Sequence, residues 1–123
     1  MTNEEYAKFV EKMAPSNLVH PICKRPTLDH AVKGICAEAG EIMEIIKALQ
    51  YYGRPVSEQH LLEEIGDLYF YTILLANSLG YTIDDIVAAN VAKLKARYPE
   101  GFSTERANNR NRENEQRAIA NCQ

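Results

Sequence analysis

Apolar side chains recur at helical spacing along most of the chain, and glycine, proline and polar residues separate the periodic stretches. Residues at i, i+3, i+4 and i+7 share one face of a helix, so each stretch predicts a helix with a buried face. Residues 16–26 carry two prolines and no period, which predicts a loop or an extended arm. The fold class is therefore all-α. The predicted helices cover residues 3–13, 28–51, 58–79 and 83–98.

Each predicted helix begins beside a residue whose side chain can accept a hydrogen bond from a free backbone N–H. Asn3, Thr27 and Ser57 are the expected caps of the first three helices. Thr82 is followed three residues later by Asp85, which predicts a capping box with Asp in the place of Glu.

Two acidic pairs lie on the apolar faces of the second and third predicted helices. The first pair is Glu38 and Glu41, and the second is Glu64 and Asp67. Both pairs have i, i+3 spacing, which places their side chains on one helix face. Carboxylates are rarely buried without a partner, so acids on a core-facing line indicate function. If the two helices run antiparallel, the carboxylates of both pairs converge.

Converging carboxylates repel one another unless a cation lies among them. Oxygen ligands favour a hard cation, Mg²⁺ or Mn²⁺, over zinc or copper. Di-iron bundles use Glu-x-x-His pairs, and neither acidic pair has a histidine at that place. Glu63 is either a residue that supports a metal ligand or a solvated one, and Glu44 lies too far round its helix to be a ligand. The predicted metal ligands are Glu38, Glu41, Glu64 and Asp67.

Cations near the end of the fourth predicted helix suit the binding of polyphosphate, because metal ions and basic side chains together neutralise phosphate oxygens. Lys93 and Arg97 are the candidates for phosphate contact, and Lys47 and Arg54 are weaker ones. Each has a structural alternative. Cations also stabilise helix C-termini, and Lys47 has Glu44 three residues before it as a partner.

Aromatic residues, histidines and cysteines add little chemistry of their own. Tyrosines can stack on a nucleic-acid base, although core packing is the better expectation for each one taken alone. The tyrosines considered are Tyr51, Tyr52, Tyr69, Tyr71 and Tyr98. The histidines show no mutual spacing, which favours surface or packing roles for His20, His30 and His60. The odd number of cysteines favours reduced thiols.

Composition bounds the possible partners. A chain of 123 residues is long enough for one domain with a core, and its net charge of −3 includes no strongly basic stripe for duplex nucleic acid. No apolar run has the length of a membrane span, and the acidic N-terminus is unlike a signal peptide. These observations favour a cytoplasmic protein that does not bind a membrane.

Two further stretches bear on assembly. Residues 68–76 are apolar nearly all round, which in a small chain predicts contact with another subunit. Residues 103–123 are rich in Asn, Arg and Glu. They are expected to form a polar C-terminal tail, a frayed helix from Thr104, or an arm that lies across a partner subunit, while residues 1–102 form the domain.

Taken together, these motifs resemble the MazG-like all-α nucleoside triphosphate pyrophosphohydrolases, a family with an E-x-x-E … E-x-x-D pattern. Residues 37–42 are similar to its E-A-G-E segment, and residues 63–68 to its E-E-x-G-D-L/V segment. Residues 90–99 resemble its N-x-x-K-L-x-x-R-[YH]-P ending. The resemblance covers residues 27–102.

The resemblance implies a four-helix-bundle-like fold that forms a homodimer or homotetramer through its helices. It implies Mg²⁺ held by the four acids, and hydrolysis of an NTP or dNTP between the α and β phosphates. Glu41 would orient or deprotonate the attacking water, with Glu38 beside it as the second catalytic carboxylate. The substrate-binding residues it implies, together with the weaker candidates, are Asn90, Lys93, Arg97, Tyr98 and Lys47.

Three other functions compete with this one. A phosphoribosyl-ATP pyrophosphohydrolase is similar in its acids. A non-catalytic helical dimer that binds nucleotide or metal would bind without turnover. In a purely structural bundle, metal would neither bind nor stabilise the fold.

Overall fold

The computed structural model describes residues 1–14 and 26–122, and in this part of the chain every regular element is a helix. This confirms the all-α class. Two compact units, residues 1–80 and residues 81–123, are each described separately. No helix in the described residues is both long and apolar enough to span a membrane.

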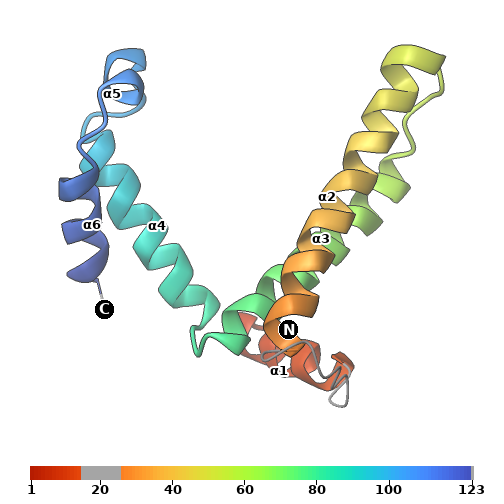
Figure 1. Ribbon diagram of the computed structural model, residues 1–123, viewed down its shortest axis with the longest axis horizontal. Coiled ribbons are helices and arrows are strands. Elements are labelled where there is room, and N and C mark those ends of the chain that lie inside the picture. Colours follow the sequence, from red (N-terminus) through yellow and green to blue (C-terminus); the bar gives the residue numbers. More distant parts are fainter. Residues whose placement is uncertain (15–25, 123) are drawn as a thin grey trace. The chain divides into compact units, whose positions relative to one another are not determined.

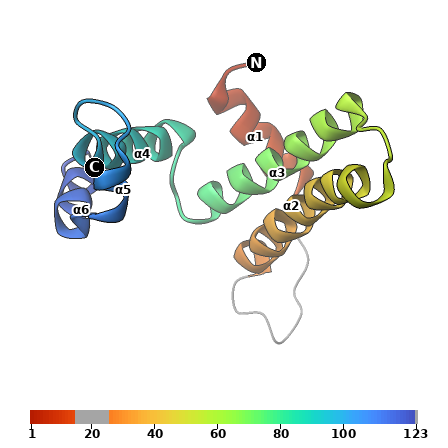
Figure 2. The same cartoon turned by 90° about the horizontal axis from the view of Figure 1, so that it is seen from above.

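The first unit contains α1 (Asn3–Met13), α2 (Pro26–Tyr52) and α3 (Glu58–Ser78). Helices α2 and α3 lie side by side, joined by a turn in which Gly53 adopts a φ of 63° (Figure 1). Helix α1 packs against α3 (Figure 2), where the Nδ2 of Asn77 donates a hydrogen bond to the carbonyl of Ala7. The buried apolar residues of this unit are Val10, Ala31, Ile73, Leu74 and Ala76.

A close approach holds α2 on α3. A Cβ added at Gly34 would lie 2.2 Å from the ring of Tyr71, so only glycine fits against that ring. Gly40, beside the first acidic pair, has no such neighbour within 4 Å among the described residues. Of the two glycines that weaken α2, Gly34 is therefore explained by helix packing.

The second unit contains α4 (Ile83–Arg97), α5 (Thr104–Asn108) and α6 (Arg112–Ala120), and α6 packs against α4. The predicted tail thus includes two helices, the first starting at Thr104. The capping box is confirmed: Asp85 N–H donates to Thr82 Oγ1 at 3.1 Å, and Thr82 N–H donates to Asp85 Oδ2 at 2.8 Å. Ser57 caps α3 as predicted.

Two predicted caps were wrong. The cap of α1 is Thr2, not Asn3, because only Thr2 has a glutamate three residues later, Glu5, to close a capping box. Thr27 lies inside α2, which begins at Pro26, a residue well suited to the first helical turn because its φ is preset and it has no N–H to satisfy.

Smaller corrections concern the helix ends and the loop. Helix α3 ends at Ser78 and α4 at Arg97, so Leu79 and Tyr98 are caps rather than helical residues. The loop prediction for residues 16–26 fails at Pro26, and its remaining residues lie outside the described part of the chain. Assembly through the helices stays a prediction, and so does the division into a 1–102 domain and a tail.

Candidate metal centre

Helices α2 and α3 bring three of the predicted carboxylates together. Single oxygens of Glu38, Glu41 and Glu64 all lie within 4.8 Å of one another. Glu64 is buried, Glu38 is half-buried and Glu41 is exposed, so the group runs from the helix interface out to the surface. The i, i+3 spacing within α2 and the packing of α3 against it produce this convergence.

The group is electrostatically strained in the absence of a cation. Burial, followed by the negative charges of Glu41, Asp67 and Glu64, raises the pKa of Glu38 above its ordinary value. A hydrogen bond to Glu64 adds to this rise. Neighbouring carboxylates that disfavour ionisation of one member are the expected signature of a site that binds a cation.

Asp67 was predicted as the fourth ligand, and that role stays a prediction. Its carboxylate is exposed and does not join the group formed by the other three within the described residues. Its charge still reaches the site, since it contributes to the raised pKa of Glu38. The same charge contributes to the raised pKa of Tyr6 on α1, where burial is the largest cause.

His60 is the site residue that sequence analysis missed. Its Nε2 lies 2.8 Å from Oε1 of Glu64, and a second group of ligand atoms combines His60, Glu63 and Glu64. Glu64 therefore belongs to both groups. The signal was present in the sequence, because His60 precedes Glu64 by four residues and so shares its helix face.

A groove with a volume of about 430 Å³ adjoins the carboxylates. Glu41 and His60 line it beside the carboxylates, and Tyr52 and Arg54 line it at the α2–α3 turn. The Arg54 guanidinium lies over the Tyr52 ring, 5.6 Å from its centroid. A cleft of this size that joins acids to an aromatic ring and a cation can hold a small charged ligand.

Most other candidates have structural roles. Lys47 pairs with Glu44 at 3.0 Å, as the alternative interpretation expected. Tyr69 stacks on Tyr6 with ring centroids 5.4 Å apart, and Tyr71 packs under Gly34. Packing was the expected role for these two tyrosines. Tyr51 is largely exposed.

The predicted phosphate-binding residues divide into two groups along α4. Asn90 and Lys93 line a separate groove of about 370 Å³ within the second unit. Arg97 instead donates to Glu115 of α6, and Tyr98 packs against Phe102 with centroids 5.4 Å apart. Sequence analysis found no role for Glu115, because a glutamate in a polar segment gives no sign of burial.

A sequence model of the MazG nucleotide pyrophosphohydrolase domain matches residues 27–102. The matched range contains both acidic pairs and all of α4, and it ends before α5. No curated protein and no solved structure matches the chain.

Proposed function

Since the chain belongs to the MazG nucleotide pyrophosphohydrolase family, we propose that it is a Mg²⁺-dependent nucleoside triphosphate pyrophosphohydrolase. It cleaves an NTP or dNTP between the α and β phosphates to give a nucleoside monophosphate and pyrophosphate, and so controls a nucleotide pool. The observation that carries the proposal is the convergence of Glu38, Glu41 and Glu64 inside the matched domain.

The residues present fit a divalent cation. Their donors are carboxylate oxygens, which suit Mg²⁺ or Mn²⁺, and the raised pKa of Glu38 reports excess negative charge that a cation would neutralise. Glu38, Glu41 and Glu64 would hold the ion, and Asp67 is the fourth ligand that the family resemblance implies. When bound, the ion neutralises phosphate oxygens and lowers the pKa of a coordinated water.

Glu41 is the best candidate for the general base. It is the exposed member of the group and it lines the adjoining groove, so it can reach both a water and a bound substrate. Glu41 would accept the proton as that water attacks phosphorus, and pyrophosphate or the monophosphate would leave with the bridging oxygen. In this proposal the groove at Tyr52 and Arg54 holds part of the nucleotide. Asn90 and Lys93 are the phosphate contacts that the family resemblance implies.

The test is pyrophosphate release from a panel of canonical and modified NTPs and dNTPs, with Mg²⁺ and with EDTA. Glu41→Gln should abolish release, whereas Glu11→Gln, at an exposed glutamate on α1 that belongs neither to the carboxylate group nor to the groove lining, should leave it intact. Phosphoribosyl-ATP belongs in the panel, because turnover of that substrate alone would replace the proposed activity. Tight binding with no turnover of any substrate would instead support the non-catalytic alternative.

Exposed apolar side chains support assembly into a homodimer or homotetramer. Met43 on α2 is 61% exposed, and Leu62 and Ile65 on α3 are 71% and 54% exposed. Exposed apolar surface of this kind is typical of a subunit interface. Light scattering after size exclusion should report a dimer or larger species, and Leu62→Glu should shift it toward monomer.

A further inference from the structure

The C-terminal helix lies outside the matched domain and yet packs on one of its helices. Helix α6 lies beside α4 and runs in the opposite direction (Figure 1), while the family match ends at residue 102. The contact is therefore an addition to the domain that the matched family shares. It is made within a single compact unit of the chain.

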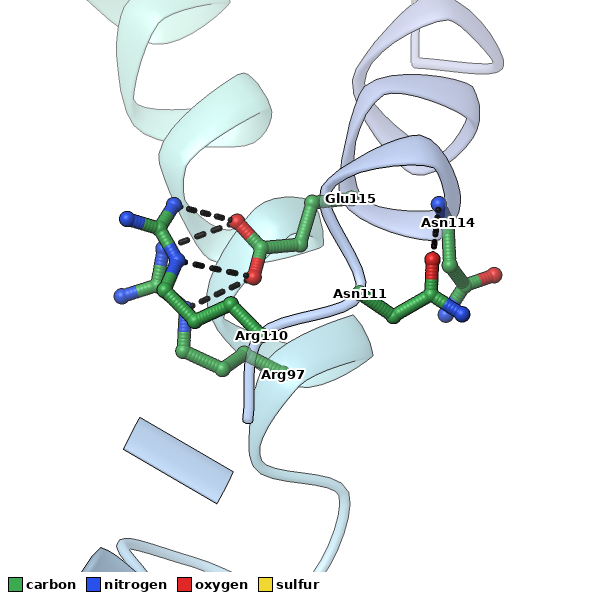
Figure 3. Close-up of polar contacts among 5 residues, drawn as sticks. All are labelled: Arg97, Arg110, Asn111, Asn114 and Glu115. Atoms are coloured by element: carbon green, nitrogen blue, oxygen red, sulfur yellow. Dashed lines mark hydrogen bonds and ion pairs between the residues drawn. The ribbon is translucent and has the colours of Figure 1, made fainter. Parts of the chain in front are cut away.

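Two arginines fasten α6 through one buried carboxylate (Figure 3). Arg97 of α4 donates from Nε to Oε1 of Glu115 at 2.9 Å and from Nη2 to Oε2 at 2.8 Å. Arg110, which precedes α6, donates to the same two oxygens at 3.3 and 2.7 Å. Glu115 is 4% exposed, and these bonds hold its pKa well below its usual range.

The Arg97 guanidinium is paired with Glu115 through two of its nitrogens. It makes a fork-to-fork pair with Glu115, and its other contact is the ring of Tyr98, 5.6 Å away. A phosphate that displaced Glu115 from Arg97 would leave the buried carboxylate with Arg110 as its remaining cationic partner, which is unfavourable. Arg97 is therefore poorly placed to exchange its partner for substrate.

Helical spacing links this ion pair to the groove that holds Asn90 and Lys93. Lys93 precedes Arg97 by four residues on α4, and Ile119 follows Glu115 by four residues on α6. Each pair shares one helix face, so the antiparallel helices bring Lys93 and Ile119 to the same place, one turn from the ion pair. Both residues line the groove of about 370 Å³.

We propose that Arg97, Arg110 and Glu115 are positioning residues. They hold α6 in register on α4 so that Ile119 forms the wall of the groove from which Asn90 and Lys93 bind the phosphate chain of a nucleotide. The C-terminal segment, through α6, then contributes to the substrate site and is not merely a tail. The assignment rests on the proposed function, because it takes Asn90 and Lys93 as nucleotide contacts.

A double-mutant cycle distinguishes this role from direct phosphate binding. The variants are Arg97→Gln, Glu115→Gln and the two combined, assayed for pyrophosphate release and for equilibrium binding of a non-hydrolysable α,β-methylene deoxynucleoside triphosphate with Mg²⁺. Each single change should raise KM and Kd about tenfold or more, with kcat little changed. The double variant should be no worse than either single one, because the residues act as one unit.

Two further variants make the result specific. Glu113→Gln removes an exposed ion pair with Arg117 on α6 and should leave KM unchanged. Ile119→Ala keeps the ion pair with Arg97 and should raise KM as Glu115→Gln does. Circular dichroism confirms that each variant is folded.

The outcomes separate the inference from the function beneath it. If wild type turns over or binds nucleotide and Glu115→Gln has an unchanged KM and Kd, the inference is wrong while the proposed function stands. The same holds if Arg97→Gln costs as much in the Glu115→Gln background as in wild type, since Arg97 would then contact phosphate directly. If wild type neither turns over nor binds any nucleotide, both fail together.

Discussion

Glu38→Gln is expected to stabilise the metal-free protein while weakening its response to metal. In the structure Glu38 faces Glu41 and Glu64 within 4.8 Å, and their charges, together with burial, raise its pKa. A neutral glutamine of similar shape removes this repulsion. The same substitution removes a predicted metal ligand, so stability and metal binding should change in opposite directions.

The size of the effect follows from the separation. Two unit charges 4.8 Å apart repel by about 1 kcal/mol in water and about 3.5 kcal/mol at an effective dielectric constant of 20. Solvent screens Glu41, which is exposed, and so reduces the repulsion below the second figure. We therefore expect Glu38→Gln to raise the free energy of unfolding by about 1–2 kcal/mol in EDTA, and Tm by about 5 °C.

Saturating Mg²⁺ should make wild type more stable than Glu38→Gln. A ligand at a hundred times its Kd stabilises a fold by about 2.7 kcal/mol, so wild type should gain about that much in saturating Mg²⁺ and exceed the variant. Urea unfolding followed by circular dichroism, in EDTA and in Mg²⁺, measures both quantities.

The matched control is Glu44→Gln on the same helix. Glu44 pairs with Lys47 at 3.0 Å outside the carboxylate group, so its loss should cost a few tenths of a kcal/mol and leave the Mg²⁺ response unchanged. The reasoning is refuted if Glu38→Gln is no more stable than wild type in EDTA, or if Mg²⁺ stabilises both equally.

Three other outcomes are expected. Gly34→Ala should lower the urea midpoint, because its Cβ would meet the Tyr71 ring at 2.2 Å and overpacking costs about 1–3 kcal/mol. Gly40→Ala, with open space around it, should raise the midpoint through helix propensity, and equal effects of the two would contradict this account. Folding lowers the pKa of Glu115, so its contribution to stability should be complete above about pH 4.5 and be lost as the pH falls below that value. Glu115→Gln should remove this part of the pH dependence of urea unfolding. An unaltered pH profile in the variant would count against the ion pair. Thr82→Ala should cost about 1 kcal/mol in urea unfolding, through the lost N-cap of α4, and a cost near zero would show that the cap is dispensable.

Local chemistry made much of the fold predictable from sequence. The period of apolar residues placed the helices to within two residues at either end, because burial of one helix face has the same spacing wherever it occurs. Asn3 was chosen over the adjacent Thr2, which can also cap, and Thr27 was chosen because the start of α2 was placed too late. In the structure Glu5 closes a capping box with Thr2, and α2 begins one residue before Thr27, at Pro26.

The candidate site was predictable only in outline. Spacing identified Glu38, Glu41 and Glu64, because i, i+3 pairs must share a helix face. It could not show that Asp67 does not join this group, since a shared helix face does not fix the distance between two side chains. Sequence analysis missed His60 because it compared the histidines only with one another, whereas the contact of His60 is with Glu64.

The sequence by itself determined the first four helices, the caps Ser57 and Thr82 and the residue types that can hold a cation, since these depend on neighbours a few positions apart. Only the tertiary structure decided which charged side chains pair with one another. Arg97 appeared free to bind phosphate until α6 brought Glu115 against it, from 18 residues further along the chain. Such a pairing depends on how two helices pack, and packing depends on contacts that no local pattern encodes.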